Sequence, residues 1–289
     1  MSSVNSLFHF LRRRYKDFEQ QRERRAYLTG GRLPWTAGYW TFRNHYIRDV
    51  LAAPDRLAAF TVRGSLPPNY GERLDERTVE YPWVLARVGT GGGRLLDAGS
   101  TLNFDFLLDH ASLREKSIVI TTLAPEGFIE RPNVSYLYGD LRDTILRDAI
   151  FDTIVCISTL EHVGMNNTML YTADTRFKEA DFFAYRAVLR EFQRLLKPGG
   201  KLLLTVPYGR YEDHGWLQQF DADRIADVLD CFAPRTSQIT YYRYLPDGWH
   251  LSTAAECADC RYFNIHTTRQ HDPDYAAAAR AVACIEATR

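Results

Sequence analysis

Residues 94–101 read Arg-Leu-Leu-Asp-Ala-Gly-Ser-Thr and decide how this chain is expected to fold. A short apolar run ends at Asp97, and Gly99 and small polar residues follow it. The apolar residues from Leu102 to Leu108 are typical of the start of a helix. This order of strand, tight turn and helix N-terminus is the layout with which α/β proteins bind nucleotide-like ligands. We therefore predict a ligand site at residues 97–103.

The composition of this turn narrows the ligand class. A phosphate-binding loop would carry more glycines, and often a lysine as in GxxxxGK[ST], whereas this turn has only Gly99. A carboxylate at Asp97 suits a cationic or hydroxyl-bearing ligand better than a phosphate. We expect a nucleoside-like cofactor without a pyrophosphate. The alternative is that Asp97 only accepts hydrogen bonds from the backbone of the turn.

Composition excludes several classes of protein. The chain has 289 residues, of which 45% are hydrophobic, and its formal net charge is zero, so no global field favours nucleic acid or an anionic membrane. Its apolar runs are far shorter than the roughly 20 residues of a membrane span, and residues 1–18 do not resemble a secretory signal. Five scattered cysteines are typical of reduced thiols, so we predict a cytoplasmic protein.

Short apolar runs alternate with helical patterns after residue 94 and predict a doubly wound, mostly parallel sheet. A long amphipathic helix at residues 182–196 ends at Lys197-Pro198-Gly199-Gly200. The expected strands are 94–98, 117–121, 134–138, 153–157, 201–206, 238–244 and 281–285.

The chain divides into two predicted parts. Residues 1–77 form an N-terminal helical cap or extension, and residues 78–289 form the α/β domain with an insertion around 246–279. The first helix has a basic character and an apolar stripe at Leu7, Leu11, Tyr15 and Phe18. Such a helix can lie on a membrane or bind a polyanion, or it can pack on the main domain or on a partner subunit. A homo-oligomer is therefore one open outcome.

Two further acidic positions follow predicted strands. Asp140 could accept a hydrogen bond from an adenine amino group, or it could simply cap a helix. Glu161 and His162 lie together at the end of the fourth strand and are candidates for a proton acceptor and its orienting partner. The alternative is that both only anchor the loop that follows.

The segments LLDAGS (95–100), YGDLRD (138–143), FDTIVCISTLEHVG (151–164) and LLKPGGKLLLTVPYG (195–209) together resemble class I S-adenosylmethionine-dependent methyltransferases. The likeness covers about residues 78–210. It implies a Rossmann-like, seven-stranded sheet whose last strand, Ala281 to Ile285, runs antiparallel, and S-adenosyl-L-methionine as the cofactor.

The resemblance also implies the cofactor residues. The methionine part would lie near Asp97, Gly99 and the turn of Ser100, Thr101 and Asn103. The adenine would meet Asp140 and Leu141, and the other wall would be formed by Ser158, Thr159 and Leu160.

Two features depart from the family pattern. The glycine-rich turn is reduced to Gly99, and Thr122 and Leu123 stand where an acidic residue normally binds the ribose hydroxyls. Replacing two charge-assisted bonds by one neutral bond is worth on the order of 1–2 kcal/mol, or about tenfold in affinity. Arg77 or Tyr70 could help by reaching the cofactor carboxylate, although a solvated helix N-terminus is an equal alternative for that segment.

The acceptor is expected to be a small molecule or a glycan hydroxyl. Methyl transfer to a hydroxyl requires a base, for which His162, supported by Glu161, and His214 are the candidates. Glu161 and His162 could instead bind a divalent metal, and Cys257 and Cys260 could form half of a zinc site, but both signals are weak and we predict no metal. The rival hypothesis is a nonenzymatic methyltransferase-like binding or scaffold subunit, which the missing ribose carboxylate favours.

Overall fold

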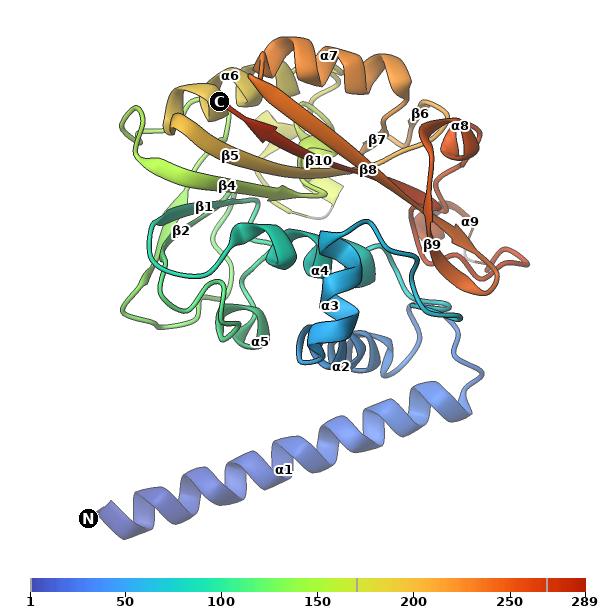
Figure 1. Ribbon diagram of the computed structural model, residues 1–289. Helices are drawn as coiled ribbons and strands as arrows, with labels where there is room; N and C mark the ends of the chain where they lie inside the picture. The colour runs from blue at the N-terminus through green and yellow to red at the C-terminus, as the bar shows by residue number, and fades with distance from the viewer. Residues whose placement is uncertain (1, 170, 269) are drawn as a thin grey trace.

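A mixed sheet organises the chain in the computed structural model, which describes residues 2–169, 171–268 and 270–289, without the side chains of residues 2–13, 16 and 17 (Figure 1). The strand order is β3-β2-β1-β4-β5-β10-β8-β9, and β3, β2, β1, β4 and β5 are parallel. The strands are β1 (Arg94–Ala98), β2 (Ser117–Thr122), β3 (Val134–Tyr138), β4 (Phe151–Ile157), β5 (Leu196–Pro207), β8 (Thr236–Leu245), β9 (Gly248–Ser252) and β10 (Ala281–Thr288).

The doubly wound fold predicted from the sequence is confirmed, with one strand more than expected. β10 pairs antiparallel with both β5 and β8, as the family resemblance implies. The eighth strand, β9, forms a hairpin with β8 and extends the edge of the sheet. Gly248 lies beside the backbone of Tyr70 with a φ of +114°, a conformation that favours glycine. This close approach joins the added strand to the segment that precedes α4.

Helices cover both faces of the sheet (Figure 1). α6 and α7 lie on one face, and α2, α3, α4 and α5 lie on the other. The helix bounds are α1 (Ser2–Thr29), α2 (Tyr39–Leu51), α3 (Pro54–Thr61), α4 (Arg77–Val88), α5 (Asp105–Leu108), α6 (Tyr185–Leu195), α7 (Ala222–Phe232), α8 (Ala254–Cys257) and α9 (Ile265–Thr268). No helix in the described part of the chain is long and apolar enough to cross a membrane.

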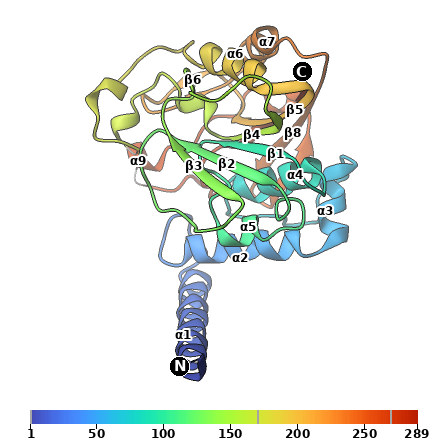
Figure 2. The same cartoon turned by 90° about the vertical axis from the view of Figure 1, so that its left-hand side faces the viewer.

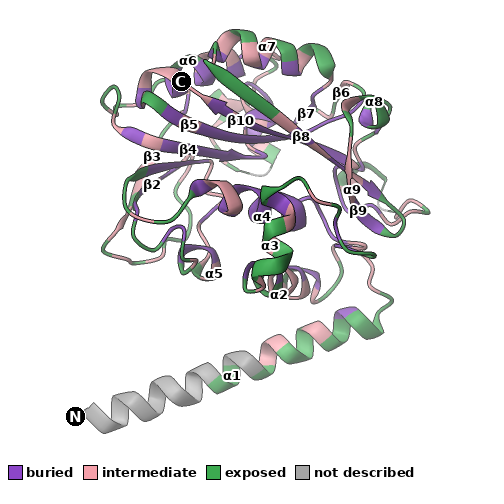
Figure 3. Ribbon diagram, in the orientation of Figure 1, coloured by how far each residue is buried: buried purple, intermediate pink, exposed green. Residues whose placement is uncertain are grey.

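The central strands are buried on both faces (Figure 3). One core cluster joins the sheet to α2, α3 and α4 and contains Trp83, and the other joins it to α6 and α7 and contains Phe192. Parallel strands that are buried on both sides read as continuous apolar runs, which explains why the sequence pattern located them.

The N-terminal helix α1 extends away from the domain (Figures 1 and 2). Tyr27 near its C-terminal end is buried against Tyr39 and Phe42 of α2. Tyr15 and Phe18 are exposed, and the other two positions of the predicted stripe, Leu7 and Leu11, fall outside the described side chains. Within the described part, the stripe therefore does not pack on the domain.

A short helix follows the turn after β1. We expected helical structure from Leu102, but α5 begins only at Asp105. The backbone of Phe104 is extended, with φ −133° and ψ 134°, so the helix can begin only after this residue.

Candidate active site

Asp97 organises the turn after β1 from beneath. Its side chain is fully buried and accepts hydrogen bonds from the N–H of Leu102 at 2.8 Å and from the N–H and hydroxyl of Thr101 at 3.2 and 3.0 Å. Burial raises the pKa of Asp97 to about 7, against the effect of these hydrogen bonds. The structure therefore shows the alternative that we raised from the sequence, in which the side chain of Asp97 accepts hydrogen bonds from the turn.

Gly99 allows this turn to meet the end of β4. Its φ is +116°, and a Cβ atom at this position would overlap the side chain of Thr159. One glycine therefore suffices here, because the close approach occurs at one position. The next residue, Ser100, also has a positive φ, of 59°, and its buried Oγ has no hydrogen-bond partner among the described residues.

A first cavity of about 180 Å³ lies above the carboxyl ends of β1, β2, β3 and β4. Parallel α/β sheets bind ligands at this edge, next to the point where the strand order reverses. The structure brings most of the predicted residues together in its wall: Arg77, Gly99, Thr101, Thr122, Leu123, Asp140, Leu141, Ser158, Thr159 and His162.

Asp140 is already paired within this wall. Its carboxylate accepts hydrogen bonds from the guanidinium of Arg142, the shortest at 2.6 Å, which holds the pKa of Asp140 below its ordinary value against the effect of burial. Arg142 also binds Glu179, and both line the cavity. The sequence analysis missed this pair, because Glu179 lies in a loop without any recognisable motif.

Other predicted cofactor residues support the cavity from outside its wall. Asn103 donates from its side-chain nitrogen to Gly127 and accepts from the hydroxyl of Tyr136, so it ties two loops together. Leu160 is fully buried in the hydrophobic core. Tyr70 is also a core residue, and its hydroxyl donates to the carbonyl of Thr78 at 2.6 Å.

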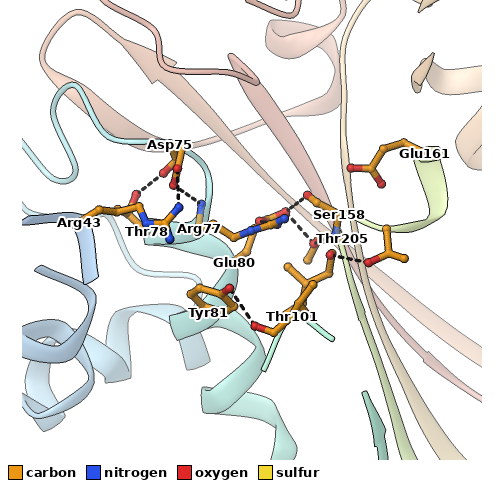
Figure 4. Close-up of polar contacts among 12 residues, drawn as sticks. Arg43, Asp75, Arg77, Thr78, Glu80, Tyr81, Thr101, Ser158, Glu161 and Thr205 are labelled. Carbon is orange, nitrogen blue, oxygen red and sulfur yellow. Dashed lines mark hydrogen bonds and ion pairs between the residues drawn. The ribbon is translucent and has the colours of Figure 1, made fainter. Parts of the chain in front are cut away.

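A buried polar network links α4 to the ends of β4 and β5 (Figure 4). Glu80 is fully buried and accepts hydrogen bonds from the hydroxyls of Ser158 and Thr205, at 2.6 and 2.7 Å. Its second carboxylate oxygen pairs with Arg77. Because Arg77 lines the cavity, this network fixes a guanidinium at the edge of the site.

The turn before α4 is held equally firmly (Figure 4). Arg43 of α2 and Asp75 form a buried ion pair at 2.7 Å, and the N–H of Asp75 donates to the hydroxyl of Tyr39. The next residues in the chain are Glu76 and Arg77, so α2 sets their positions. This contribution of the N-terminal segment was not predicted, since residues so distant in sequence carry no common pattern.

A second cavity, of about 410 Å³, shares part of its wall with the first. Residues Arg77, Ser158, His162 and Tyr171 line both. The remaining wall comes from segments spread over the whole chain and is rich in aromatic side chains: Trp35, Trp40, Trp216, Tyr262, Phe263 and His266. Two acidic side chains, Glu76 and Glu161, also line it. The two cavities are therefore neighbours with different chemistry.

His162 stands between the two cavities. Its Nδ1 is 2.9 Å from the carbonyl oxygen of Trp216, which fixes the proton on Nδ1 and leaves the lone pair on Nε2. Nε2 is 3.3 Å from the hydroxyl of Tyr171 and 3.9 Å from a carboxylate oxygen of Glu161. Burial lowers the pKa of His162 to about 4, so the ring is neutral at physiological pH.

The second base candidate, His214, lies apart from this junction. Its Nε2 is 3.5 Å from Glu212, and its ring packs against Tyr262. Cys257 and Cys260 are buried free thiols, and no group of three or more metal-ligating side chains gathers among the residues that the structure describes.

Comparison with known proteins is consistent with this geometry. Residues 87–204 match a family model described as a methyltransferase domain. A search of curated protein sequences gave no match.

Three similar solved structures are distant in sequence. A 1,6-didemethyltoxoflavin N1-methyltransferase of Burkholderia thailandensis is 16% identical, with a TM-score of 0.41 over 82% of this chain and 90% of that one. A phosphoethanolamine N-methyltransferase of Haemonchus contortus is 13% identical, with a TM-score of 0.45 over 72% and 52%. The YcgJ protein of Bacillus subtilis is 13% identical, with a TM-score of 0.42 over 73% and 97%.

The first cavity fits the cofactor of this family. It combines apolar walls at Leu123 and Leu141, a hydroxyl at Thr122, a carboxylate at Asp140 and a cation at Arg77, which match the adenine, the ribose and the charged methionine end of S-adenosylmethionine. Together with the strand order, the match at residues 87–204 shows that this part of the chain is similar to a methyltransferase domain.

Proposed function

We propose that the first cavity binds S-adenosylmethionine and that the second binds a small molecule or glycan whose hydroxyl receives the methyl group. The observation that carries this proposal is the shared wall, where His162 and Ser158 belong to both cavities. A transfer reaction requires its two substrates to meet at one point, and proximity of this kind provides a large part of the rate enhancement.

In the first cavity, Arg77 would bind the carboxylate of the cofactor, while Leu123 and Leu141 would enclose the adenine. Asp140 would accept from the adenine amino group with its remaining lone pairs, because a carboxylate offers about four acceptor sites. Thr122 would contact the ribose. When bound, the cofactor supplies an electrophilic methyl group on a sulfonium centre.

In the second cavity, His162 would act as the general base. Nε2 carries the lone pair because Nδ1–H is held by the carbonyl of Trp216, and the acceptor hydroxyl would take the place of the Tyr171 hydroxyl, which lies 3.3 Å from Nε2. The acceptor hydroxyl would give its proton to Nε2 as its oxygen forms the new bond. Glu161, whose nearer oxygen is 3.9 Å from Nε2, would stabilise the imidazolium that results. His214 is the weaker candidate, because its nearest charged neighbour is Glu212 rather than a group at the junction.

Two measurements test this proposal. Calorimetric titration with S-adenosylhomocysteine should give saturable heat, and no heat at high micromolar ligand with folded protein would contradict the cofactor assignment.

For the base, we expect His162→Gln to retain affinity for S-adenosylhomocysteine within about twofold and to lose about 10²-fold or more in methyl transfer to a panel of sugar and phenol acceptors. His214→Gln is the matched control and should retain the rate. Full activity of the His162 variant would exclude this residue as the base.

A further inference from the structure

Two carboxyl groups in the second cavity each keep one buried oxygen without a hydrogen-bond partner among the described residues. Glu161 is 2% exposed and Glu76 is 9% exposed, and both line this cavity. The Oε2 atom of each is buried without a hydrogen-bond partner among the described residues. Buried carboxylate oxygens are costly to leave unpaired, so native proteins generally supply them with a donor. Here the open side is the cavity, and a ligand is the available donor.

The charges around the cavity leave these two groups unbalanced. Arg77 is paired with Glu80, and Arg43 with Asp75, so both nearby guanidinium groups are already engaged. His162 is neutral because burial lowers its pKa. Burial and the charges of Asp75 and Glu80 together raise the pKa of Glu76 to about 8, against the opposing effect of Arg77. Burial and the charges of Glu80 and Glu76 likewise raise the pKa of Glu161. Arg77 is thus the one permanent cation among the described residues that line this cavity, and it is already paired with Glu80.

The aromatic wall agrees with a positively charged occupant. Trp35, Trp216 and Tyr262 line the same cavity as the two carboxyl groups. The faces of aromatic rings attract cations, most strongly where water is excluded. The indole N–H of Trp216 is also buried without a partner among the described residues, and it could donate to an oxygen of the same ligand.

We propose that the acceptor carries a protonated amine in addition to its reacting hydroxyl, and that Glu76 and Glu161 bind this amine in the second cavity. The inference rests on the proposed function for its placement of the acceptor beside His162. An ammonium group suits the site better than another hydroxyl, because it brings three donors and a positive charge that favours the ionised form of both carboxyl groups, whereas a hydroxyl brings one donor and no charge. The substrate class is thus a small amino alcohol, amino sugars included, that fits about 410 Å³.

A matched pair of probes tests the inference without any variant. Benzylamine and benzyl alcohol have the same ring and methylene group and differ in the charged nitrogen. We expect the full chain, saturated with S-adenosylhomocysteine, to bind benzylamine at least tenfold more tightly than benzyl alcohol at pH 7 in a calorimetric titration. Equal affinities, or no heat from either probe, would overturn the inference.

Variants then locate the amine. Glu76→Gln and Glu161→Gln keep the shape of the side chain and remove its charge, and each should weaken benzylamine binding about tenfold or more while benzyl alcohol is unaffected. Glu115→Gln, at an exposed carboxylate outside the cavity, is the matched control and should change nothing. Unchanged benzylamine affinity in both cavity variants would exclude these carboxylates as its partners.

The cofactor serves as an independent readout. Affinity for S-adenosylhomocysteine should stay within about twofold in all three variants, which also shows that they are folded. A parallel loss of this affinity would mean that the carboxylates bind the ammonium group of the cofactor, and would overturn the inference. Failure of the wild-type protein to bind S-adenosylhomocysteine would instead contradict the proposed function, whatever the probes show.

Discussion

The two cavities on either side of His162 are built in opposite ways. In the first, the acidic groups Asp140 and Glu179 are already bonded to Arg142. In the second, Glu76 and Glu161 each keep a buried oxygen without a partner in the described part of the chain. The first cavity is thus organised before its ligand arrives, whereas the second is completed by its ligand.

The two cavities differ in this way because their walls are formed by different parts of the chain. The first cavity lies at the ends of adjacent parallel strands, whose ladders fix the turns between them. The second is assembled from the start of α4, the loops after β4 and β5, the N-terminal segment and the segment before β10. Specificity for an acceptor can therefore change in the second cavity without disturbing the strand ends that form the first.

The largest effect should come from Gly99→Ala. The substitution places a Cβ against Thr159 at a φ of +116°, so the turn must move away from the end of β4. We expect S-adenosylhomocysteine binding to fall below detection in calorimetry. Gly91→Ala is the control, since Gly91 also has a positive φ, of 89°, but no neighbouring atom within 4 Å of the added Cβ. Retained affinity in the Gly99 variant would show that the first cavity is not preorganised.

The next effect concerns the wall between the cavities. Glu80→Gln leaves the partly buried guanidinium of Arg77 with an uncharged partner, and removing one charge of a buried pair costs up to about 3–5 kcal/mol. We expect a loss of this order in the free energy of unfolding, measured by urea denaturation. The double variant Arg77→Met/Glu80→Gln should be less destabilised than the sum of the single variants. If the losses in free energy of unfolding of the two single variants simply add up in the double variant, Arg77 and Glu80 do not act as a pair.

Asp97 provides a pH test of its structural role. Its pKa is about 7 in the folded chain and near 3.8 in the unfolded chain, so between these values the folded state binds more protons. The free energy of unfolding should therefore fall as pH rises from 4 to 7, on the order of 3 kcal/mol from this group. The Asp97→Asn variant should lack this part of the slope. Identical slopes in urea titrations of the two proteins would contradict the prediction.

The smallest effect should be a gain at the end of β2. Thr122 lines the first cavity where a carboxylate could bind two ribose hydroxyls. We expect Thr122→Glu to raise the affinity for S-adenosylhomocysteine about tenfold, or about 1.4 kcal/mol, because a carboxylate makes charge-assisted bonds to a diol. Thr122→Gln separates charge from size and should give little gain. A loss with Glu would place the ribose elsewhere.

Most of the sheet could be predicted because its strands are short apolar runs separated by helical patterns. All seven expected strands are present, and the last one is antiparallel. β9 was missed, because Gly248–Ser252 lacks the β-branched pattern of the others and is defined by its pairing with β8. The helix expected from Leu102 begins later, since the backbone at Phe104 is extended.

The site residues could be predicted where they directly follow the ends of strands. Ten of the predicted residues line the first cavity because consecutive motifs end at the same edge of the sheet. Glu76 and Glu179 escaped prediction because each lies in a segment without periodic or motif signals, and only packing against distant elements gives them a role.

The sequence by itself therefore determined where the seven expected strands lie along the chain, the turn at Gly99 and the placement of His162 at the end of β4. Local patterns and short turns encode these features. Only the tertiary structure decided which acidic groups are satisfied and which remain open. The pairing of Asp140 with Arg142, of Asp75 with Arg43 and of Glu80 with Arg77 depends on how the elements pack. Two carboxyl groups that look alike in sequence, Asp97 and Glu161, differ because one finds donors in its own turn and the other faces a cavity.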